Sequence, residues 1–357
     1  MPRRAAEPLP LCFALTVPGL ETVAADEIAK DFDADLKRAS RGLVVFRPPA
    51  IDRSLLRIRT VEDVFLLLWG TDSLSYRAED LKRITRWTAN EPDWPRMLQW
   101  HHGVRPKPAG KPTYHLVAQM HGERGYRRVD AQTAMAKGLA GKLPTSWRPV
   151  SEGANIEVWL IIDGKQAVCG LRLSDKSMRH RWYKEEHRPA SLRPVVAAAM
   201  VRLVLPRPQD WLLDPTCGAG TILAERLLMD RTALVLGGDQ DAGALYASAT
   251  NLRKLGEANL VRWDARQLPL ANESVACIAC NPPFGKQLGE PEDIGPLYAD
   301  VVAELARVLK PGGRAALLVS DLSPLEDAIR PWGWKRLEKL RLRLLGQNAW
   351  LGVWRAR

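Results

Sequence analysis

The pattern of apolar and polar residues along the chain changes near position 188. From there on, short apolar runs alternate with segments whose apolar residues recur at helical spacing, which is typical of a parallel sheet with helices on both faces. The last segment, 332–357, fits an antiparallel hairpin at the edge of this sheet. The expected strands are 211–214, 233–237, 260–262, 275–280 and 314–319, and the expected helices are 221–229, 242–255 and 296–309.

The first half of the chain lacks this regular alternation. Strand-like and helix-like runs follow each other irregularly, and Asp163-Gly164 marks a tight hairpin turn. The segment 101–111, rich in basic residues and prolines, is expected to form an exposed loop. The expected strands are 11–17, 43–46, 113–118, 154–162 and 166–173, and the expected helices are 20–32 and 131–143.

Charge and cysteine content narrow the class of protein. The 357 residues include 52 Lys and Arg against 41 Asp and Glu, a net charge of +11, which favours a polyanionic partner. The five cysteines are scattered and odd in number, which argues against a disulfide framework and indicates a reducing compartment. No apolar run has the length of a signal peptide or a membrane span, so we expect a cytoplasmic protein.

Polar side chains follow four successive strand-like runs, at Asp214, Asp239, Asp264 and Asn281. In open α/β sheets, ligands bind beyond the carboxyl ends of the strands. Asp214 could accept a hydrogen bond from the ammonium group of a cofactor, Asp239 from ribose hydroxyls and Asp264 from an adenine amine. Between the first two, a Gly-rich turn at 217–220 lets the backbone approach a ligand closely, which a Cβ would prevent.

A dinucleotide is the obvious rival cofactor, but it usually requires G-x-G-x-x-G. Here the glycines stop at Gly220, and an acidic residue precedes the turn, which favours a cofactor without phosphates, such as S-adenosylmethionine (SAM). The segment 187–200 could close one wall of the pocket, with Pro194 in a first helical turn and Ser191 as its cap. The candidate cofactor-binding residues are Pro189, Ala190, Ser191, Leu192, Asp214, Thr216, Cys217, Gly218, Gly220, Thr221, Asp239, Gln240, Asp264, Ala265 and Asn281.

The candidate catalytic residues are Asn281, Pro282, Pro283 and Phe284. Two prolines fix the backbone, so the Asn281 side chain and the Pro282 carbonyl could hold an exocyclic amine by its two hydrogens, while Phe284 stacks on the base. A proline turn that caps a buried strand is the plainer alternative. Cys277 and Cys280 have the spacing of half a zinc site, but no second pair exists and their run is apolar, so we expect neither metal binding nor a cysteine nucleophile.

These motifs resemble those of the class I SAM-dependent methyltransferases, as does Pro311-Gly-Gly313. More narrowly, nearly the whole chain resembles the THUMP-domain RNA guanine-N2 methyltransferases. The motifs that carry this likeness are His187-Arg-Pro-Ala-Ser-Leu-Arg-Pro194, Asp214-Pro-Thr-Cys-Gly-Ala-Gly220 and Asn281-Pro-Pro-Phe-Gly-Lys286 followed by Leu297-Tyr298. The family often has Arg where this chain has Gln287, which puts one phosphate contact in doubt.

The resemblance implies an α/β protein with an N-terminal ferredoxin-like α+β domain at 1–75, a THUMP RNA-binding domain at 76–175, a linker at 176–187 and a Rossmann-like methyltransferase domain at 188–357. It implies a tRNA substrate, held by its 3′ end and acceptor stem, and N2-methylguanosine at position 6 as the product. Neither membrane nor DNA is expected as a partner. A monomer is expected, and an activator subunit stays open. The candidate RNA-binding residues are Arg105, Lys107, Lys111, Arg127, Arg128, Lys137, Lys142 and Lys286.

Other activities stay open at this point. The same chemistry at guanosine 10 of tRNA or on rRNA would use the same residues, and adenine-N6 and glutamine-N5 methyltransferases share the Asn-Pro-Pro-aromatic motif. An RNA-binding assembly protein with an inactive catalytic fold is the non-enzymatic alternative. THUMP enzymes that make thiouridine need a Ser-Gly-Gly nucleotide loop, which this sequence lacks.

Overall fold

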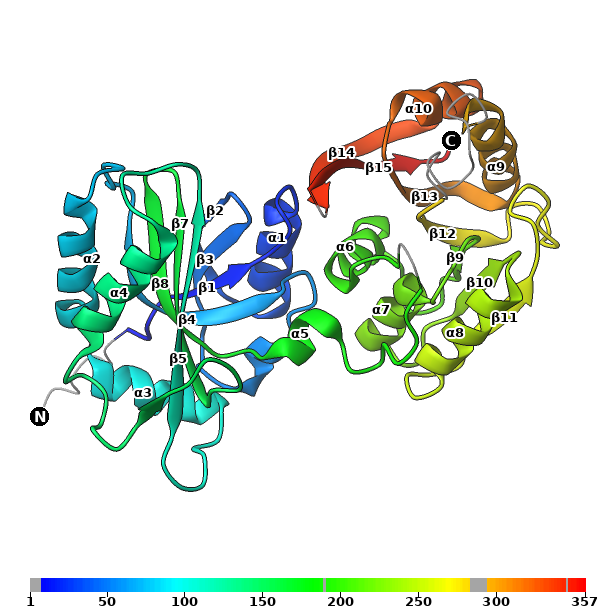
Figure 1. Ribbon diagram of the computed structural model, residues 1–357. Helices are drawn as coiled ribbons and strands as arrows, with labels where there is room; N and C mark the ends of the chain where they lie inside the picture. Colours follow the sequence, from blue (N-terminus) through cyan, green and yellow to red (C-terminus); the bar gives the residue numbers. More distant parts are fainter. Residues whose placement is uncertain (1–7, 189–190, 283–293, 345) are drawn as a thin grey trace, which may run out of the picture. The chain divides into compact units, whose positions relative to one another are not determined.

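The computed structural model of the chain describes residues 8–188, 191–282, 294–344 and 346–357. The chain divides into two compact units, each with its own sheet (Figure 1). The first unit contains the residues up to Leu15, together with Ala25–Ile58 and Asp63–Met178. The second unit contains Thr16–Ala24, Arg59–Glu62 and Arg179–Arg357, so two short segments of the N-terminal half belong to the C-terminal unit.

The second unit is built on a seven-stranded sheet in the order β11-β10-β9-β12-β13-β15-β14. Its neighbouring strands are parallel except for β15, which pairs antiparallel with both β13 and β14. The chain reverses its direction of progress between β9 and β12, which is where ligands bind in sheets of this kind. The strands are β9 (Leu212–Asp214), β10 (Val235–Asp239), β11 (Asn259–Arg262), β12 (Val275–Cys280), β13 (Leu309–Val319), β14 (Lys335–Leu344) and β15 (Gln347–Arg355).

Helices cover both faces of this sheet, and each face has its own apolar core. On one face, α6, α7 and α8 pack against the strands, and α6 is buried over most of its length. On the other face, α9 and α10 do so (Figure 1). The predicted α/β class with a Rossmann-like C-terminal sheet is confirmed. The helices are α6 (Pro194–Val204), α7 (Thr221–Met229), α8 (Ala242–Leu252), α9 (Ile294–Val308) and α10 (Ser323–Ile329), followed by the 3-10 turn η4 (Arg330–Trp332).

The first unit holds an eight-stranded mixed sheet in the order β2-β3-β1-β4-β8-β7-β5-β6. Its strands β4 and β8 pair directly, so one continuous sheet joins the segments predicted as ferredoxin-like and THUMP domains. The division of this half into two domains stays a prediction. The strands are β1 (Cys12–Leu15), β2 (Asp35–Ser40), β3 (Leu43–Arg47), β4 (Asp63–Thr71), β5 (Thr113–His121), β6 (Arg148–Pro149), β7 (Ile156–Asp163) and β8 (Gln166–Arg172).

The expected strands and helices of this half are present, and the structure adds elements that had not been predicted, among them β4, β6, α2 and α5. The segment at 101–104, expected to be part of an exposed loop, instead ends helix α3, because the His101 ring is buried and contacts the Arg172 carbonyl oxygen at 3.1 Å. Strand β2 was not predicted. The helices of this half are α1 (Glu21–Asp31), α2 (Glu79–Asn90), α3 (Trp94–Val104), α4 (Arg128–Leu139) and α5 (Lys176–His180), with the 3-10 turn η1 (Arg53–Arg57).

A buried ion cluster ties three separate segments of the second unit together. The Glu225 carboxylate on α7 is fully buried and accepts hydrogen bonds from the Arg59 guanidinium at 2.8–2.9 Å, the Arg181 Nε at 3.2 Å and the Tyr183 hydroxyl at 2.7 Å. Burial, reinforced by the Glu225 charge, raises the pKa of Tyr183. The stretch predicted as a linker at 176–187 therefore contributes two buried side chains to the core of this unit.

Candidate active site

The Gly-rich turn after β9 has a backbone that only glycine adopts readily. Gly218 and Gly220 have positive φ angles of +54° and +74°. A Cβ at Gly220 would lie 2.3 Å from the Ser248 hydroxyl oxygen on α8, whereas a Cβ at Gly218 would meet no atom within 4 Å. The Cys217 amide donates to the Gly238 carbonyl at 2.9 Å, which fixes the turn beside β10. Gly220 is therefore needed for packing, and Gly218 leaves open space beside the backbone.

Two carboxylates hold the base of this turn. Asp239, at the end of β10, accepts hydrogen bonds from the backbone amides of Gly218 and Asp241, each at 3.0 Å. Asp214, at the end of β9, is almost fully buried and accepts from the Thr216 amide at 3.3 Å. Burial, with a smaller contribution from the nearby Asp239 charge, raises the pKa of Asp214 to about 8. A cation beside Asp214 would therefore offset the cost of burying its ionised carboxylate.

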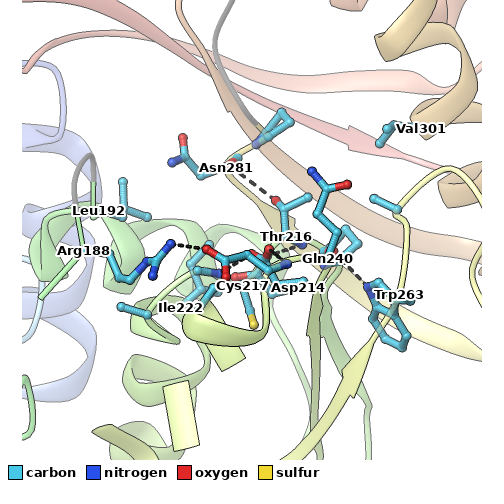
Figure 2. Close-up of a pocket in the computed structure, with 18 of the residues that line it drawn as sticks. Arg188, Leu192, Asp214, Thr216, Cys217, Ile222, Gln240, Trp263, Asn281 and Val301 are labelled. Atoms are coloured by element: carbon cyan, nitrogen blue, oxygen red, sulfur yellow. Dashed lines mark hydrogen bonds and ion pairs between the residues drawn. The ribbon is translucent and has the colours of Figure 1, made fainter. Parts of the chain in front are cut away.

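These residues border a cavity of about 460 Å³ at the carboxyl edge of the sheet (Figure 2). Every predicted cofactor-binding residue that the structure describes lines this cavity except Gly220, which instead caps α7. Pro189 and Ala190 lie outside the described residues. The structure also adds lining residues that were not among the candidate site residues, before α6, on α7, α8 and α9, and in the loops after β10 and β11. They are Arg188, Ile222, Asp241, Ala244, Trp263, Arg266, Leu297 and Val301.

An ion pair joins two sides of the cavity. The Arg188 guanidinium pairs with the Asp241 carboxylate (Figure 2), and Asp241 also accepts from the Gly243 amide at 2.7 Å as the N-cap of α8. The sequence signal for this pair was weak, because the two residues are far apart in the chain and each alone reads as a surface charge. The sequence had predicted Ser191 as the cap of α6, but it does not occupy that position. Arg193 occupies the N-cap position, and the Ser191 hydroxyl is buried at the cavity with no protein partner among the described residues.

Asp264 also borders the cavity, but its carboxylate already has a partner. The Arg266 guanidinium contacts it at 2.6–3.1 Å, and the Arg266 amide donates to it at 2.9 Å. These hydrogen bonds lower the pKa of Asp264. Contact between Asp264 and an adenine amine stays a prediction, and it would have to share the carboxylate with Arg266.

The Asn281 side chain lies at the end of β12 and has an unused hydrogen-bond acceptor. Its backbone carbonyl accepts from the Thr216 hydroxyl at 3.4 Å, whereas its side-chain Oδ1 is buried and has no partner in the part of the chain described here (Figure 2). Pro282 is buried directly after it. A buried acceptor without a donor is costly unless a ligand supplies one. Pro283 and Phe284 lie outside the described residues.

Cysteine chemistry is not supported at this edge. The Cys280 thiol is fully buried and lies 3.3 Å from the Thr216 hydroxyl, and burial raises its pKa. The thiols of all five cysteines are buried and none is in a disulfide. A thiol held in its protonated form is a poor nucleophile.

The candidate RNA-binding cations differ in whether a carboxylate of the protein already pairs with them. Arg105 pairs with Asp175 at 2.7 Å and Arg127 with Asp130 at 3.4 Å. The remaining described candidates, Lys107, Lys111, Arg128, Lys137 and Lys142, are exposed. Lys286 lies outside the described residues. Across the described ranges, no helix combines the length and the apolar character needed to cross a bilayer.

Comparison with known proteins finds methyltransferases. Residues 181–348 match the family described as RMKL-like, methyltransferase domain (UPF0020). The crystal structure of TrmN from Thermus thermophilus aligns over 97% of this chain and 99% of that chain, with a TM-score of 0.80 and 25% identity. The tRNA (guanine(6)-N2)-methyltransferase of Thermus thermophilus is 28% identical over 325 residues, which are 89% of this chain and 91% of that protein.

Over most of its length this chain is similar to the THUMP-associated RNA guanine-N2 methyltransferase family. A mammalian relative, the tRNA (guanine(6)-N(2))-methyltransferase THUMP3 of Bos taurus, is 30% identical over 220 residues, which are 57% of this chain and 43% of that protein. The chain thus spans less than half of the length of that relative. Members of this family are SAM-dependent methyltransferases.

Proposed function

We propose that this protein is a SAM-dependent tRNA methyltransferase that makes N2-methylguanosine at position 6 of the acceptor stem. The observation that carries the proposal is the buried, unpartnered Oδ1 of Asn281 at the wall of the cavity. The full-length likeness to the Thermus thermophilus enzyme supports the choice of guanine N2 and of position 6. We also place the protein in the cytoplasm, as a monomer, in keeping with its free thiols.

The cavity residues fit SAM in size and in chemistry. Gly218 leaves room for a ligand beside the backbone, and the raised pKa of Asp214 favours a neighbouring cation such as the ammonium of SAM. Two backbone amides already hold the Asp239 carboxylate in place, so it is ready to accept hydrogen bonds from the ribose hydroxyls. The apolar side chains of Ile222, Leu192 and Val301 add an apolar lining. When bound, SAM supplies the methyl group and leaves as S-adenosylhomocysteine.

Asn281 and Pro282 would then hold the target amine. Oδ1 of Asn281 and the carbonyl of Pro282 accept the two hydrogens of the guanine 2-amino group, which turns the nitrogen lone pair toward the methyl donor. The nitrogen gains a methyl group, and one of its protons leaves to solvent afterwards. Catalysis would then rest on orientation. The site would hold the guanine nitrogen against the methyl carbon of SAM, and no strong base would be needed.

We propose that the N-terminal half holds the tRNA, with the ferredoxin-like domain at 1–75 and the THUMP domain at 76–175. The exposed lysines and Arg128 named above are candidates for phosphate contacts. Arg105 and Arg127 would have to give up or share their carboxylate partners, so we rank them below the others.

The proposal is tested by incubating the full-length protein with methyl-labelled SAM and unmodified tRNA transcripts, then separating the nucleosides. We expect label in N2-methylguanosine. Label in N6-methyladenosine would keep the methyl-transfer site and overturn the guanine substrate. Label in a protein glutamine, or none in RNA while SAM binds, would overturn the RNA substrate for the isolated protein.

A further inference from the structure

Three cations project from one face of the hairpin formed by β14 and β15. Lys339, Arg341 and Arg343 alternate with Leu340 and Leu342 along β14, and all three cations are exposed. Leu340 and Leu342 pack into the core on the α6 side of the sheet, so the cations point to the opposite face. Residues two apart in a strand stand about 7 Å from each other, so the three charges form a regular row.

An aromatic ring holds part of this row in place. Trp350 of β15 pairs with Arg341 in the sheet, and its ring lies 5.0 Å from the Lys339 ammonium and 5.9 Å from the Arg341 guanidinium. Such cation–π contacts orient the two side chains without neutralising them. We call Lys339, Arg341, Arg343 and Trp350 the hairpin patch.

Within the described part of the chain, no carboxylate pairs with any cation of the hairpin patch. The contrast lies on the same strand, where Arg336 pairs with Glu326 of α10. Arg336 therefore has a compensating carboxylate, whereas the three cations nearer the end of the strand have none among the described residues. Three like charges held in a row repel one another and call for an anionic partner.

The hairpin patch lies at the same edge of the sheet as the candidate active site. Trp350 pairs with Val319, the last residue of β13, while Leu317 of β13 pairs with Cys280 of β12. Trp350 is therefore level with the residues that directly follow β12, which are Asn281 and Pro282. The strand order places β15 two strands from β12, or roughly 10 Å at the usual strand spacing.

The opposite face of the hairpin is packed, which fixes the backbone that carries the row of charges. The segment 16–24 of the same unit covers it, and Val17 and Leu20 join Leu342 in one apolar core. The fit is close at Gly19, where a Cβ would lie 2.1 Å from the Arg341 carbonyl oxygen. A backbone that is already fixed needs no ordering when the cations bind a ligand, which lowers the entropic cost of binding.

We propose that the hairpin patch binds the phosphate backbone of the RNA substrate beside the nucleotide being methylated. This inference rests on the proposed function and adds a contact on the catalytic unit itself. A nucleic-acid backbone presents charges at regular intervals, as the patch does. Among the described residues beside the patch, Gln347 and Asn348 are exposed and polar and Trp350 is half-buried, which favours a nucleic-acid backbone over a lipid surface.

The test replaces Lys339, Arg341 and Arg343 with Gln in one variant. The control variant replaces Arg231, Lys310 and Lys335, three exposed cations at the opposite edge of the same sheet, and removes the same charge. The affinity for a tRNA transcript is measured by filter binding at several salt concentrations, together with SAM affinity and the melting temperature. We expect the patch variant to bind tRNA about tenfold or more weakly, with a salt slope shallower by about two to three, while the control stays close to wild type.

SAM affinity and melting temperature should be unchanged in both variants. A patch variant that binds tRNA with the affinity and salt slope of the control would overturn the inference, even if the protein methylates guanine N2. If the patch variant loses RNA binding but the wild type labels another nucleoside, the inference stands and the proposed reaction fails. Loss of binding to anionic lipid vesicles without loss of tRNA binding would reassign the patch to a membrane surface.

Location on the RNA provides a second readout. A photo-crosslinker attached to Arg343→Cys should react with nucleotides of the acceptor stem, because the patch lies close to Asn281. Crosslinks that map to the anticodon arm would contradict a position beside the target nucleotide.

Discussion

The indole N–H of Trp263 donates a 2.9 Å hydrogen bond to the backbone carbonyl of Pro215, the residue that follows Asp214. The same ring fills the space beside Gly238, where a Cβ would lie 2.0 Å from the ring. Trp263, which directly follows β11, thus supports the segment that leads into the Gly-rich turn, and Gly238 supplies the room that the ring needs. Trp263 itself also lines the cavity, so it both borders this space and supports the turn beside it.

Replacing Trp263 with Phe should weaken both the fold and the cofactor site. The ring is retained, but the buried Pro215 carbonyl loses its donor, which costs about 1–3 kcal/mol of unfolding free energy. We expect SAM affinity to fall severalfold because the turn loses a fixed point. Urea denaturation and calorimetry measure the two effects. Trp332→Phe, at an exposed tryptophan of the same unit, is the control, and equal behaviour of the two variants would contradict this role.

Replacing Asn281 with Ala should separate catalysis from cofactor binding. The variant removes the side-chain acceptor proposed to orient the target amine, so single-turnover methylation of tRNA should slow by at least about a hundredfold. SAM affinity should stay within about twofold of wild type, because Asn281 contacts the target and only borders the cofactor. Asn259→Ala, on an exposed position of β11, should be unaffected in both measurements. Normal turnover in Asn281→Ala would remove this residue from the catalytic site.

Replacing Glu225 with Gln should strongly destabilise the second unit. The change leaves the Arg181 guanidinium, which is 3% exposed, without its buried counter-charge, at a cost of about 3–5 kcal/mol. Glu326→Gln breaks an ion pair whose partners are both partly exposed, and should cost less than about 1 kcal/mol. Both values come from urea denaturation monitored by tryptophan fluorescence. A cost below 1 kcal/mol at Glu225 would show that the cluster is not a major source of stability.

The raised pKa of Asp214 predicts how stability depends on pH. Between the ordinary value of 3.8 and about 8, the folded protein keeps a proton that the unfolded chain releases, so stability should fall as pH rises through this range. In Asp214→Asn this fall should be reduced, and the variant should be more stable than wild type near pH 9. Thermal melts from pH 5 to pH 9 without SAM measure the difference. Parallel curves for the two proteins would show that Asp214 titrates normally.

The sequence predicted the elements that have clear boundaries. Helix α7 and strand β12 have the expected bounds, because a glycine precedes the first and an Asn-Pro-Pro sequence follows the second. Strand β2 was missed because its residues are largely polar and exposed, and only pairing with β3 makes them a strand. Helix α3 was also missed, because tertiary contacts of His101, rather than an apolar period, fix its last turn.

The part of the candidate site that lies at the ends of strands could be predicted from the sequence. Asp214, Asp239, Asp264 and Asn281 each follow an apolar run, and parallel strands bring such ends together. The Arg188–Asp241 pair and Trp263 could not be found this way, because folding alone brings them to the cavity. The hairpin patch had no signal either, since three cations on β14 read as an ordinary solvated strand face until their register with Trp350 is known.

The most direct test of the proposed reaction compares two tRNA transcripts that differ by one amino group. One has guanosine at position 6 and the other has inosine, which lacks only the 2-amino group, and both are incubated with the protein and methyl-labelled SAM. The proposed reaction predicts label in the guanosine transcript, recovered as N2-methylguanosine, and none in the inosine transcript. Equal label in both transcripts would contradict methyl transfer to the guanine 2-amino group at position 6.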